Sequence, residues 1–308
     1  MLIYLLKRLI RLPGLWLALI TLTFGMRLLI PGDPVETLFA QQPATAEVIA
    51  EVRHELGLDQ PLPIQYFNYL ANVVQGDLGK SLITRRPVLS EISERYLKTV
   101  LLAGVGLTIA LIFGIGSGVV AVWIKNRVLN TGLTALNVVL LSMPSFWLGL
   151  LLLDWFSLQL GWLPVLSDNP LVQLILPALS LGLVSGALLS RVVKAELLEV
   201  MNQDYIKTAQ AKGLTHRAIL IRHALKNALT PVLTLARLQF GGLMGGAIII
   251  ENVFAWPGLG QLAVQAINQR DYPIIQGLVL LTATTYVAVN TGVDLLYHWL
   301  DPRIQNPG

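Results

Sequence analysis

The segment Gly79-Lys80-Ser81 has the residue types that end a nucleotide-binding phosphate loop, and it is the first candidate for chemistry in this sequence. A complete loop also needs a glycine at position 74, which is occupied by Val74. Backbone amides cradle the phosphates of ATP only when the whole loop is present. The sequence therefore predicts that this chain neither binds nor hydrolyses ATP.

Other catalytic and metal-binding patterns are missing from the 308-residue sequence. It has no cysteine, its four histidines are scattered, and no stretch has the Gly-x-Ser-x-Gly or His-Glu-x-x-His spacing of hydrolases. We therefore expect no enzymatic activity, no metal and no cofactor in this chain. Its basic residues form no stripe interleaved with aromatic residues, which argues against nucleic acid as a partner.

Composition instead places the chain in a membrane. Charged residues make up 13% of the sequence and apolar residues 54%, against about 25% charged residues in soluble domains. Apolar runs long enough to cross a bilayer as a helix occur six times. We predict an all-α membrane protein with one domain, 1–308, and spans near 9–30, 99–123, 132–160, 171–190, 228–250 and 274–300. The third span contains Pro144, which predicts a kink or a break because proline removes a backbone hydrogen bond.

The distribution of lysine and arginine predicts how the spans are oriented. These residues collect before the first span, between the second and third spans, and in the 191–227 link, whereas Asp168 is the charged residue of the 161–170 link. Because basic links stay in the cytoplasm, both termini and 191–227 should be cytoplasmic. The 31–98 segment then lies outside, and the net charge of +4 reflects topology.

The outer segment contains a predicted amphipathic helix at about 46–56. One helical face carries Val48, Ile49, Val52 and Leu56, and Gly57 stands where the helix should end. Packing against the membrane surface and contact with an external partner are both compatible with this pattern.

Charged residues inside the predicted spans are candidates for function because burying a charge in lipid is costly. They are Arg27, Asp154, Arg237 and Asp294. Arg237 and Asp294 fall at the cytoplasmic ends of their spans, and Arg27 and Asp154 at the outer ends, so each pair could meet across the bundle. Alternatively, the arginines extend to the headgroups while the aspartates face a wet pore. Ligand binding is a third possibility.

Small residues and aromatic residues mark two further features. Glycines in the second and fifth spans predict faces for close helix packing, either within the bundle or at a dimer seam: Gly104, Gly106, Gly114, Gly116, Gly118, Gly241, Gly242, Gly245 and Gly246. After the fifth span, Phe254-Ala255-Trp256-Pro257-Gly258-Leu259-Gly260 predicts a turn. Its tryptophan would either help to shape the outer mouth of a pore or anchor the chain at the lipid interface.

The 191–227 link reads as helix, turn, helix, with Gly213 at the interruption. A rigid, basic helical projection of this kind is suited to receive motion from a cytosolic partner.

Several blocks in and around this link resemble a known family. The run Asp204-Tyr205-Ile206-Lys207-Thr208-Ala209-Gln210-Ala211-Lys212-Gly213-Leu214, followed by Arg222-His223-Ala224-Leu225-Lys226-Asn227-Ala228-Leu229-Thr230-Pro231, is similar to the ATPase-coupling loop of ABC-importer permeases of the dipeptide, oligopeptide, glutathione and nickel branch. Further blocks that agree are Pro31-Gly32-Asp33-Pro34, Leu56-Gly57-Leu58-Asp59-Gln60-Pro61-Leu62, Glu251-Asn252-Val253-Phe254 through Gly260, and Arg270-Asp271-Tyr272-Pro273. The resemblance runs nearly from end to end. One departure is that Lys207-Thr208-Ala209 stands where the wider family has Glu-Ala-Ala.

The resemblance implies a type I permease of six membrane helices in a bacterial inner membrane, with an extracytoplasmic segment and a cytoplasmic coupling helix. It implies contact with the ATPases through Asp204, Tyr205, Ala209, Lys212, Gly213, Arg222 and His223. The implied partners are a second homologous permease subunit, two ABC ATPases that hold ATP and magnesium, an external solute-binding protein, and membrane lipid.

The implied activity is import by alternating access, with small peptides, glutathione, nickel or metal chelates as substrate classes that the sequence does not separate. It also leaves open whether the two permease halves are identical. An ion-driven secondary transporter is the alternative, but such a protein predicts inverted repeats, and none is apparent in the sequence.

Overall fold

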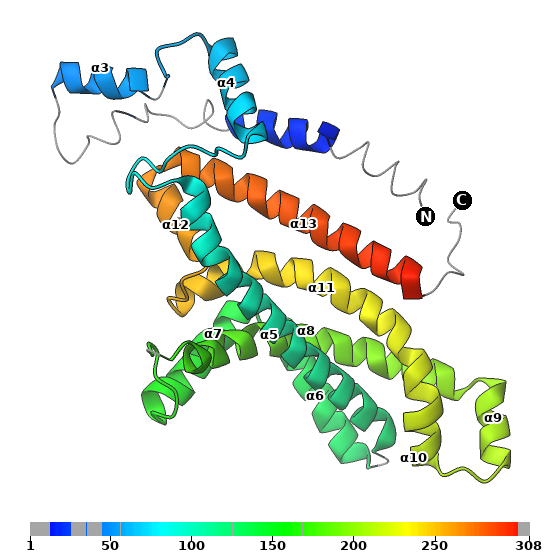
Figure 1. Ribbon diagram of the computed structural model, residues 1–308. Coiled ribbons are helices and arrows are strands. Elements are labelled where there is room, and N and C mark those ends of the chain that lie inside the picture. Colours follow the sequence, from blue (N-terminus) through cyan, green and yellow to red (C-terminus); the bar gives the residue numbers. More distant parts are fainter. Residues whose placement is uncertain are drawn as a thin grey trace. The chain divides into compact units, whose positions relative to one another are not determined.

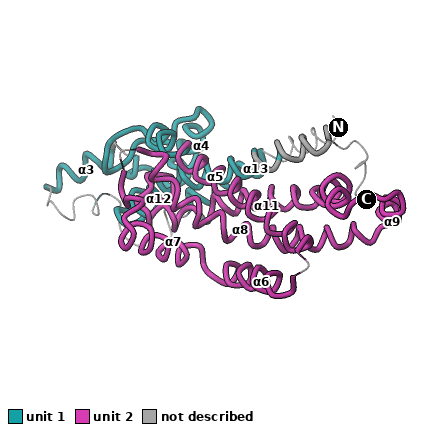
Figure 2. Tube along the Cα trace, turned by 90° about the horizontal axis from the view of Figure 1, so that it is seen from below, with its two compact units in different colours: residues 1–96, 262–308 teal, residues 97–261 magenta. Residues whose placement is uncertain are grey.

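A computed structural model of the chain consists of helices joined by short turns (Figure 1). The structure describes residues 13–25, 35, 45–55, 57–124, 126–167 and 169–300, without the side chains of 55, 246, 289–290 and 292–300. The chain divides into two compact units, coloured separately in Figure 2. Unit 1 combines residues 1–96 with 262–308, and unit 2 is 97–261. Nothing in this division tests the predicted single permease domain, 1–308, which stays a prediction.

Unit 1 contains the outer segment and the last helix. Its helices are Pro13–Gly25, α3 (Ala46–Glu55), α4 (Leu62–Val74), the start of α5 (Val88–Trp123), most of α12 (Leu259–Gln269), and α13 (Tyr272–Leu300). Ile20, Val73 and Leu280 form a buried apolar cluster in this unit. The helix Pro13–Gly25, α4 and α13 each present one apolar face to the others there. Gln276 adds a side-chain hydrogen bond from α13 to the carbonyl of Thr23 at 3.0 Å.

Unit 2 contains the remainder of α5 and the helices that follow it. They are α6 (Arg127–Ser142), α7 (Ser145–Leu153), the π-helical turn η1 (Asp154–Gln159), α8 (Pro170–Met201), α9 (Asp204–Ala211), α10 (His216–Ile219), the π-helical turn η2 (Leu220–Ala224) and α11 (Leu225–Val253). Helix α8 packs against α6, α7 and α11. It therefore forms the centre of this unit.

Glycines let α5 and α8 approach closely. A Cβ atom at Gly114 would lie 2.6 Å from the Leu189 Cβ, and one at Gly118 would lie 2.6 Å from the Val193 Cβ. On α8, a Cβ at Gly186 would lie 3.0 Å from the Ala110 carbonyl oxygen. The predicted packing role is therefore confirmed for the α5 glycines at these positions. Gly104 has open space around it instead, as do Gly116, Gly242 and Gly245.

The predicted break at Pro144 is confirmed. Helix α6 ends at Ser142, α7 begins at Ser145, and the two segments meet at 107°. Met143 adopts extended φ and ψ values of −88° and 132°, as expected for the residue before a proline. This angle makes the pair either a broken span or a re-entrant loop.

Among the described residues, two helices, α5 and α8, are each long and apolar enough to cross a membrane, and up to four spans result if each bent pair counts as one. The apolar helices Pro13–Gly25 and Tyr272–Ala288 correspond to parts of the predicted first and last spans but are shorter within the described residues. Helix α5 begins at Val88 rather than near 99, and α8 continues to Met201 beyond 190. Hydropathy marks the lipid-crossing part of a helix, whereas these helices continue through polar residues that also favour helix.

The helix predicted at about 46–56 is confirmed as α3, Ala46–Glu55, and its location outside the membrane stays a prediction. Val52 is buried and Val48 is exposed, so one edge of its apolar face is covered. Gly57 ends the helix with φ of +64°, and the Leu58 amide donates to the Arg53 carbonyl oxygen at 2.9 Å. This is the left-handed glycine cap that the sequence predicts. Whether α3 meets lipid or a partner stays a prediction.

Candidate coupling loop and pore-mouth segment

The part of the predicted coupling loop, 191–227, that follows α8 is a short helical hairpin, residues 204–224, whose turn is built around Gly213. Gly213 has φ of +79°, a left-handed conformation that favours glycine. Its amide donates to the Gln210 carbonyl oxygen at 2.9 Å, and the Leu214 amide donates to the Ala209 carbonyl oxygen at 3.3 Å. These two bonds close α9 as a Schellman motif. The next helix begins at once, because the Thr215 hydroxyl accepts from the Ala218 amide at 3.3 Å.

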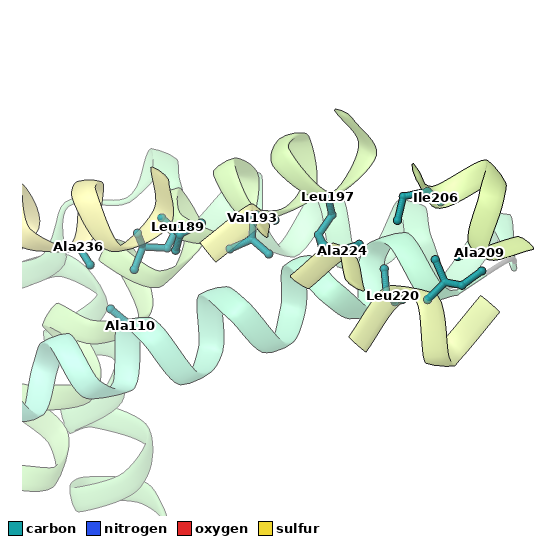
Figure 3. Packing of buried hydrophobic residues seen from close by; sticks show 12 residues of the cluster. Ala110, Leu189, Val193, Leu197, Ile206, Ala209, Leu220, Ala224 and Ala236 are labelled. Carbon is teal, nitrogen blue, oxygen red and sulfur yellow. The ribbon is translucent and has the colours of Figure 1, made fainter. Parts of the chain in front are cut away.

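A continuous apolar core holds this hairpin to the long helices (Figure 3). Ile206 and Ala209 occupy one face of α9 and are buried against the cluster that contains Leu220 and Ala224. The same cluster continues through Leu197 on α8 to residues of α5 and α11, including Ala110 and Ala236. Such packing makes the loop an extension of the membrane helices rather than a flexible linker.

The opposite face of the hairpin is exposed and polar. Among the residues that the sequence assigns to ATPase contact, the exposed ones are Asp204, Tyr205, Lys212, Gly213, Arg222 and His223. Ala209 is instead buried and packs within the loop, and its part in coupling stays a prediction. Asp204 pairs with Lys207 at 2.8 Å, and the Tyr205 hydroxyl accepts from Asn227 Nδ2 at 2.7 Å.

The sequence did not indicate which residues of this loop are buried in its apolar core. Ile206, Ile219 and Leu220 are each almost fully buried. The spacing of Ile206 and Ala209, three apart in a helix with polar neighbours, was the available signal. Arg217 also lies over the Trp123 ring, with 5.7 Å between the guanidinium carbon and the ring centroid, which links α10 to the end of α5.

The candidate pore-mouth segment, residues 251–261, is organised by the buried carboxylate of Glu251. Its Oε1 accepts from the Thr99 hydroxyl at 2.6 Å, and its Oε2 accepts from the amides of Gly260 at 2.6 Å and Gln261 at 3.2 Å. The Thr99 hydroxyl accepts in turn from the Leu259 amide at 2.8 Å. A carboxylate among the amides at the beginning of α12 is favoured electrostatically. The network fixes the turn between α11 and α12.

Trp256 contributes to the same turn from inside the core. It is 2% exposed, and its Nε1 donates to the Lys98 carbonyl oxygen at 3.1 Å. A lipid-interface anchor would present its ring to the surface. The anchoring interpretation is therefore wrong for Trp256, and its role is to hold the pore-mouth segment to α5.

Ser81 has a structural role in a turn rather than a phosphate-binding role. Its buried hydroxyl donates to Asp271 Oδ2, while the Leu82 amide donates to Asp271 Oδ1 at 3.2 Å. The Ser81 oxygen also accepts from the amides of Ile83 at 3.2 Å and Thr84 at 3.0 Å.

Within the described residues, no His, Asp or Glu side chains gather into a cluster of three that could hold a metal ion.

Family models match almost the whole chain. Residues 106–306 match the binding-protein-dependent transport system inner membrane component, and residues 1–103 match the N-terminal model of such membrane components. The chain belongs to this family. It is a permease of an ABC importer.

Relatives of this permease share its full length. The glutathione transport system permease protein GsiC of Pectobacterium atrosepticum is 44% identical over 306 residues, which are 99% of each chain. The protein of the same name from Escherichia coli strain K12 is 41% identical over 305 residues, again 99% of each chain.

Solved structures confirm the type I permease fold. An inward-facing methionine ABC transporter, MetNI, matches with a TM-score of 0.59 at 17% identity, covering 68% of this chain and 96% of that one. An amino acid ABC transporter with histidines matches with a TM-score of 0.55 at 14% identity, covering 68% and 93%. At these identities the likeness concerns fold.

The structure describes the predicted intramembrane charges of the permease only in part. Arg27 lies outside the described residues, and the side chain of Asp294, on α13, is not described. Asp154 is partly buried and accepts from Gln159 Nε2 at 2.7 Å. Arg237 is partly buried on α11. The two proposed ion pairs therefore stay predictions.

Proposed function

We propose that this permease forms one half of the pore of an importer for glutathione and related small peptides, driven by separate ATPases. Identity above 40% over the whole length of two glutathione permeases supports this substrate class. In this proposal a second permease subunit completes the pore, an external binding protein delivers the substrate, and two ATPases bind ATP and magnesium. The chain itself needs no cofactor and has no ATPase site.

The observation that carries the proposal is the attachment of the coupling loop. Its inner face shares one apolar core with α8 and α11, and its outer face leaves charged and polar groups exposed. A partner that pushes on the outer face therefore displaces the helices rather than bending a linker. We assign Asp204, Tyr205, Lys212, Arg222 and His223 to the contact with the ATPases.

Transport by the complete reconstituted complex tests this function. Vesicles containing both permease halves, the ATPases and the binding protein should accumulate labelled glutathione when ATP is inside, and unlabelled small peptides should compete. Free amino acids serve as the control for peptide selectivity. Uptake that does not depend on ATP and is abolished by a protonophore would contradict this mechanism and indicate an ion-driven one.

Purification of the permease without ATPase subunits tests the assignment of ATP hydrolysis. We expect neither nucleotide binding nor turnover, because the phosphate loop lacks its first glycine and Ser81 is committed to Asp271. Turnover by this preparation, lost in Lys80→Ala, would contradict the assignment.

A further inference from the structure

Unit 2 has a groove between α5, α6 and α8, at the end where α8 approaches the coupling loop. It consists of two cavities of about 310 Å³ and 510 Å³, which share the lining residues Thr134, Val138 and Lys194. The smaller cavity reaches along the helices to Leu141 and Ala187. The larger one lies at the beginning of α6. Together they form one continuous amphipathic site.

The two ends of this groove differ in chemistry. Val138, Leu141 and Ala187 provide apolar walls away from the beginning of α6, and Ala121 adds one from the last turn of α5. Three cations stand at the other end, and no carboxylate is present among the lining residues; the cations are Arg127, Arg191 and Lys194. This distribution matches a molecule with a negative head and an apolar tail.

The cations are not neutralised within the groove. Lys194 Nζ donates to Asn130 Oδ1 and Thr134 Oγ1, both at 3.4 Å, which are long bonds to neutral oxygens. Arg127 and Arg191 are exposed. A phosphate between them would therefore gain charge-assisted hydrogen bonds without displacing an existing ion pair.

Asn137 is a further polar residue of this groove, in addition to the three cations. Its Nδ2 donates to the Leu133 carbonyl oxygen at 3.0 Å, while its buried Oδ1 has no hydrogen-bond partner in the described part of the chain. A buried acceptor without a donor costs stability. Asn137 therefore adds an unsatisfied polar group to the wall of the smaller cavity.

We propose that this groove binds an anionic phospholipid, with the phosphate at Arg127, Arg191 and Lys194 and one acyl chain along Val138 and Leu141. Basic pockets between membrane helices recognise such headgroups. Helix α8 leads from Lys194 directly into the coupling loop. A lipid that joins α6 to α8 here therefore adjusts how readily the loop moves, which makes lipid composition a regulator of the permease.

Lipid retention tests the proposal without requiring transport. The permease is purified from bilayers that contain about 30% phosphatidylglycerol in phosphatidylethanolamine, and retained lipid is identified by mass spectrometry. Arg191→Gln with Lys194→Gln should lower retained phosphatidylglycerol by about tenfold. The control pair, Lys80→Gln with Lys98→Gln, removes the same amount of charge. Lys80 precedes α5, Lys98 lies in its first part, and neither lines the groove. This control should retain wild-type amounts of phosphatidylglycerol. Equal retention in all three proteins would overturn the proposal.

A second pair of variants tests the acyl-chain part of the groove. Val138 lines both cavities and is 57% exposed, whereas the neighbouring Val139 is 49% exposed and lines neither. Val138→Trp should displace the lipid, and Val139→Trp should not. Inorganic phosphate should fail to displace phosphatidylglycerol, because it lacks the acyl chain. Displacement by phosphate would show that the groove is an anion site only.

Occupation of the groove by protein is the remaining alternative outcome. Because the chain lacks cysteine, Val138→Cys can be crosslinked selectively within the assembled complex. We expect reaction with a phospholipid that carries a thiol-reactive group on its acyl chain. Crosslinking to the second permease subunit instead would show that the groove is a subunit interface and would overturn the lipid assignment.

Discussion

Thr99 and Glu251 are joined by a buried hydrogen bond of 2.6 Å, in which the threonine hydroxyl donates to the carboxylate. The same hydroxyl accepts from the Leu259 amide, so one small side chain serves both the end of α11 and the beginning of α12. The pore-mouth segment is thereby attached to α5. Its position depends on a pair of residues that are 152 positions apart in the sequence.

Thr99→Val should destabilise the permease by about 1–3 kcal/mol, because it removes the partner that Thr99 supplies to the Leu259 amide and to Glu251 Oε1 in the core. The two side chains have nearly the same shape, so packing is preserved. Thr99→Ser keeps the hydroxyl and is the matched control. Thermal unfolding of the purified permease measures both, and equal losses in the two variants would show that the methyl group matters instead.

Local features of this fold could be predicted from the sequence. The helix of the outer segment, the break at Pro144 and the turn at Gly213 each follow from residues within a few positions of one another. The family blocks also indicate the coupling loop. The buried face of that loop was missed because Ile206 and Ala209 occur among charged residues, which dominate the pattern.

Long-range polar pairs could not be predicted in this way. Ser81 and Asp271 are 190 positions apart, and no local periodicity connects them. The serine instead suggested an incomplete phosphate loop. Trp256 was ambiguous for a related reason, since an aromatic residue at the end of a span suits either lipid or core. Tertiary packing decides between such alternatives.

The glycine seam between α5 and α8 predicts a contrast within one helix. Gly114→Ala places a Cβ atom 2.6 Å from the Leu189 Cβ and should cost about 1–3 kcal/mol through overpacking. Gly104→Ala has open space and should be neutral or stabilising by up to about 1 kcal/mol, since alanine favours helix. Thermal unfolding in one detergent compares them. Equal stability of both variants would contradict the close approach of the two helices.

The outer segment contains a pH-sensitive pair that joins the last turn of α3 to the residues after it. His54 Nδ1 and Asp59 Oδ2 lie 2.7 Å apart, and both side chains are substantially exposed. The hydrogen bond to Asp59 and its negative charge raise the pKa of His54 above 6.5, and the hydrogen bond to His54 lowers the pKa of Asp59 below 3.8. The His54 contribution is complete below pH 6.5 and is lost as pH rises through its raised pKa. The Asp59 contribution is present above pH 3.8 and is lost as pH falls through its lowered pKa.

We therefore expect amides around this pair to be better protected near about pH 5.5 than near about pH 9. Hydrogen exchange, corrected for its intrinsic pH dependence, measures the difference. His54→Gln cannot become charged and should remove it. A difference that persists in this variant would assign the pH dependence to another group.

Orientation follows from the distribution of basic residues and can be tested by labelling. Leu166, which is 66% exposed, lies in the link before α8, and Gln210 lies in the coupling loop. In the cysteine-free chain, Leu166→Cys should react with an impermeant thiol reagent from outside intact cells, and Gln210→Cys only after the membrane is opened. The reverse pattern would place the coupling loop outside and would contradict its contact with cytosolic ATPases.

Coupling itself should depend on the backbone at Gly213. Proline cannot adopt φ of +79°, and it lacks the amide that donates to the Gln210 carbonyl oxygen, so Gly213→Pro should rebuild the turn. Gly213→Ala keeps that bond, and its Cβ would meet no atom within 4 Å, so its cost is the left-handed conformation alone, about 1–2 kcal/mol. We expect Gly213→Pro to abolish uptake and binding-protein-stimulated ATP hydrolysis in the reconstituted complex, while Gly213→Ala lowers both only partly. Membrane insertion should be normal in both variants, because the spans are unchanged. Full uptake with full stimulation in Gly213→Pro would mean that the ATPases move the permease through another surface.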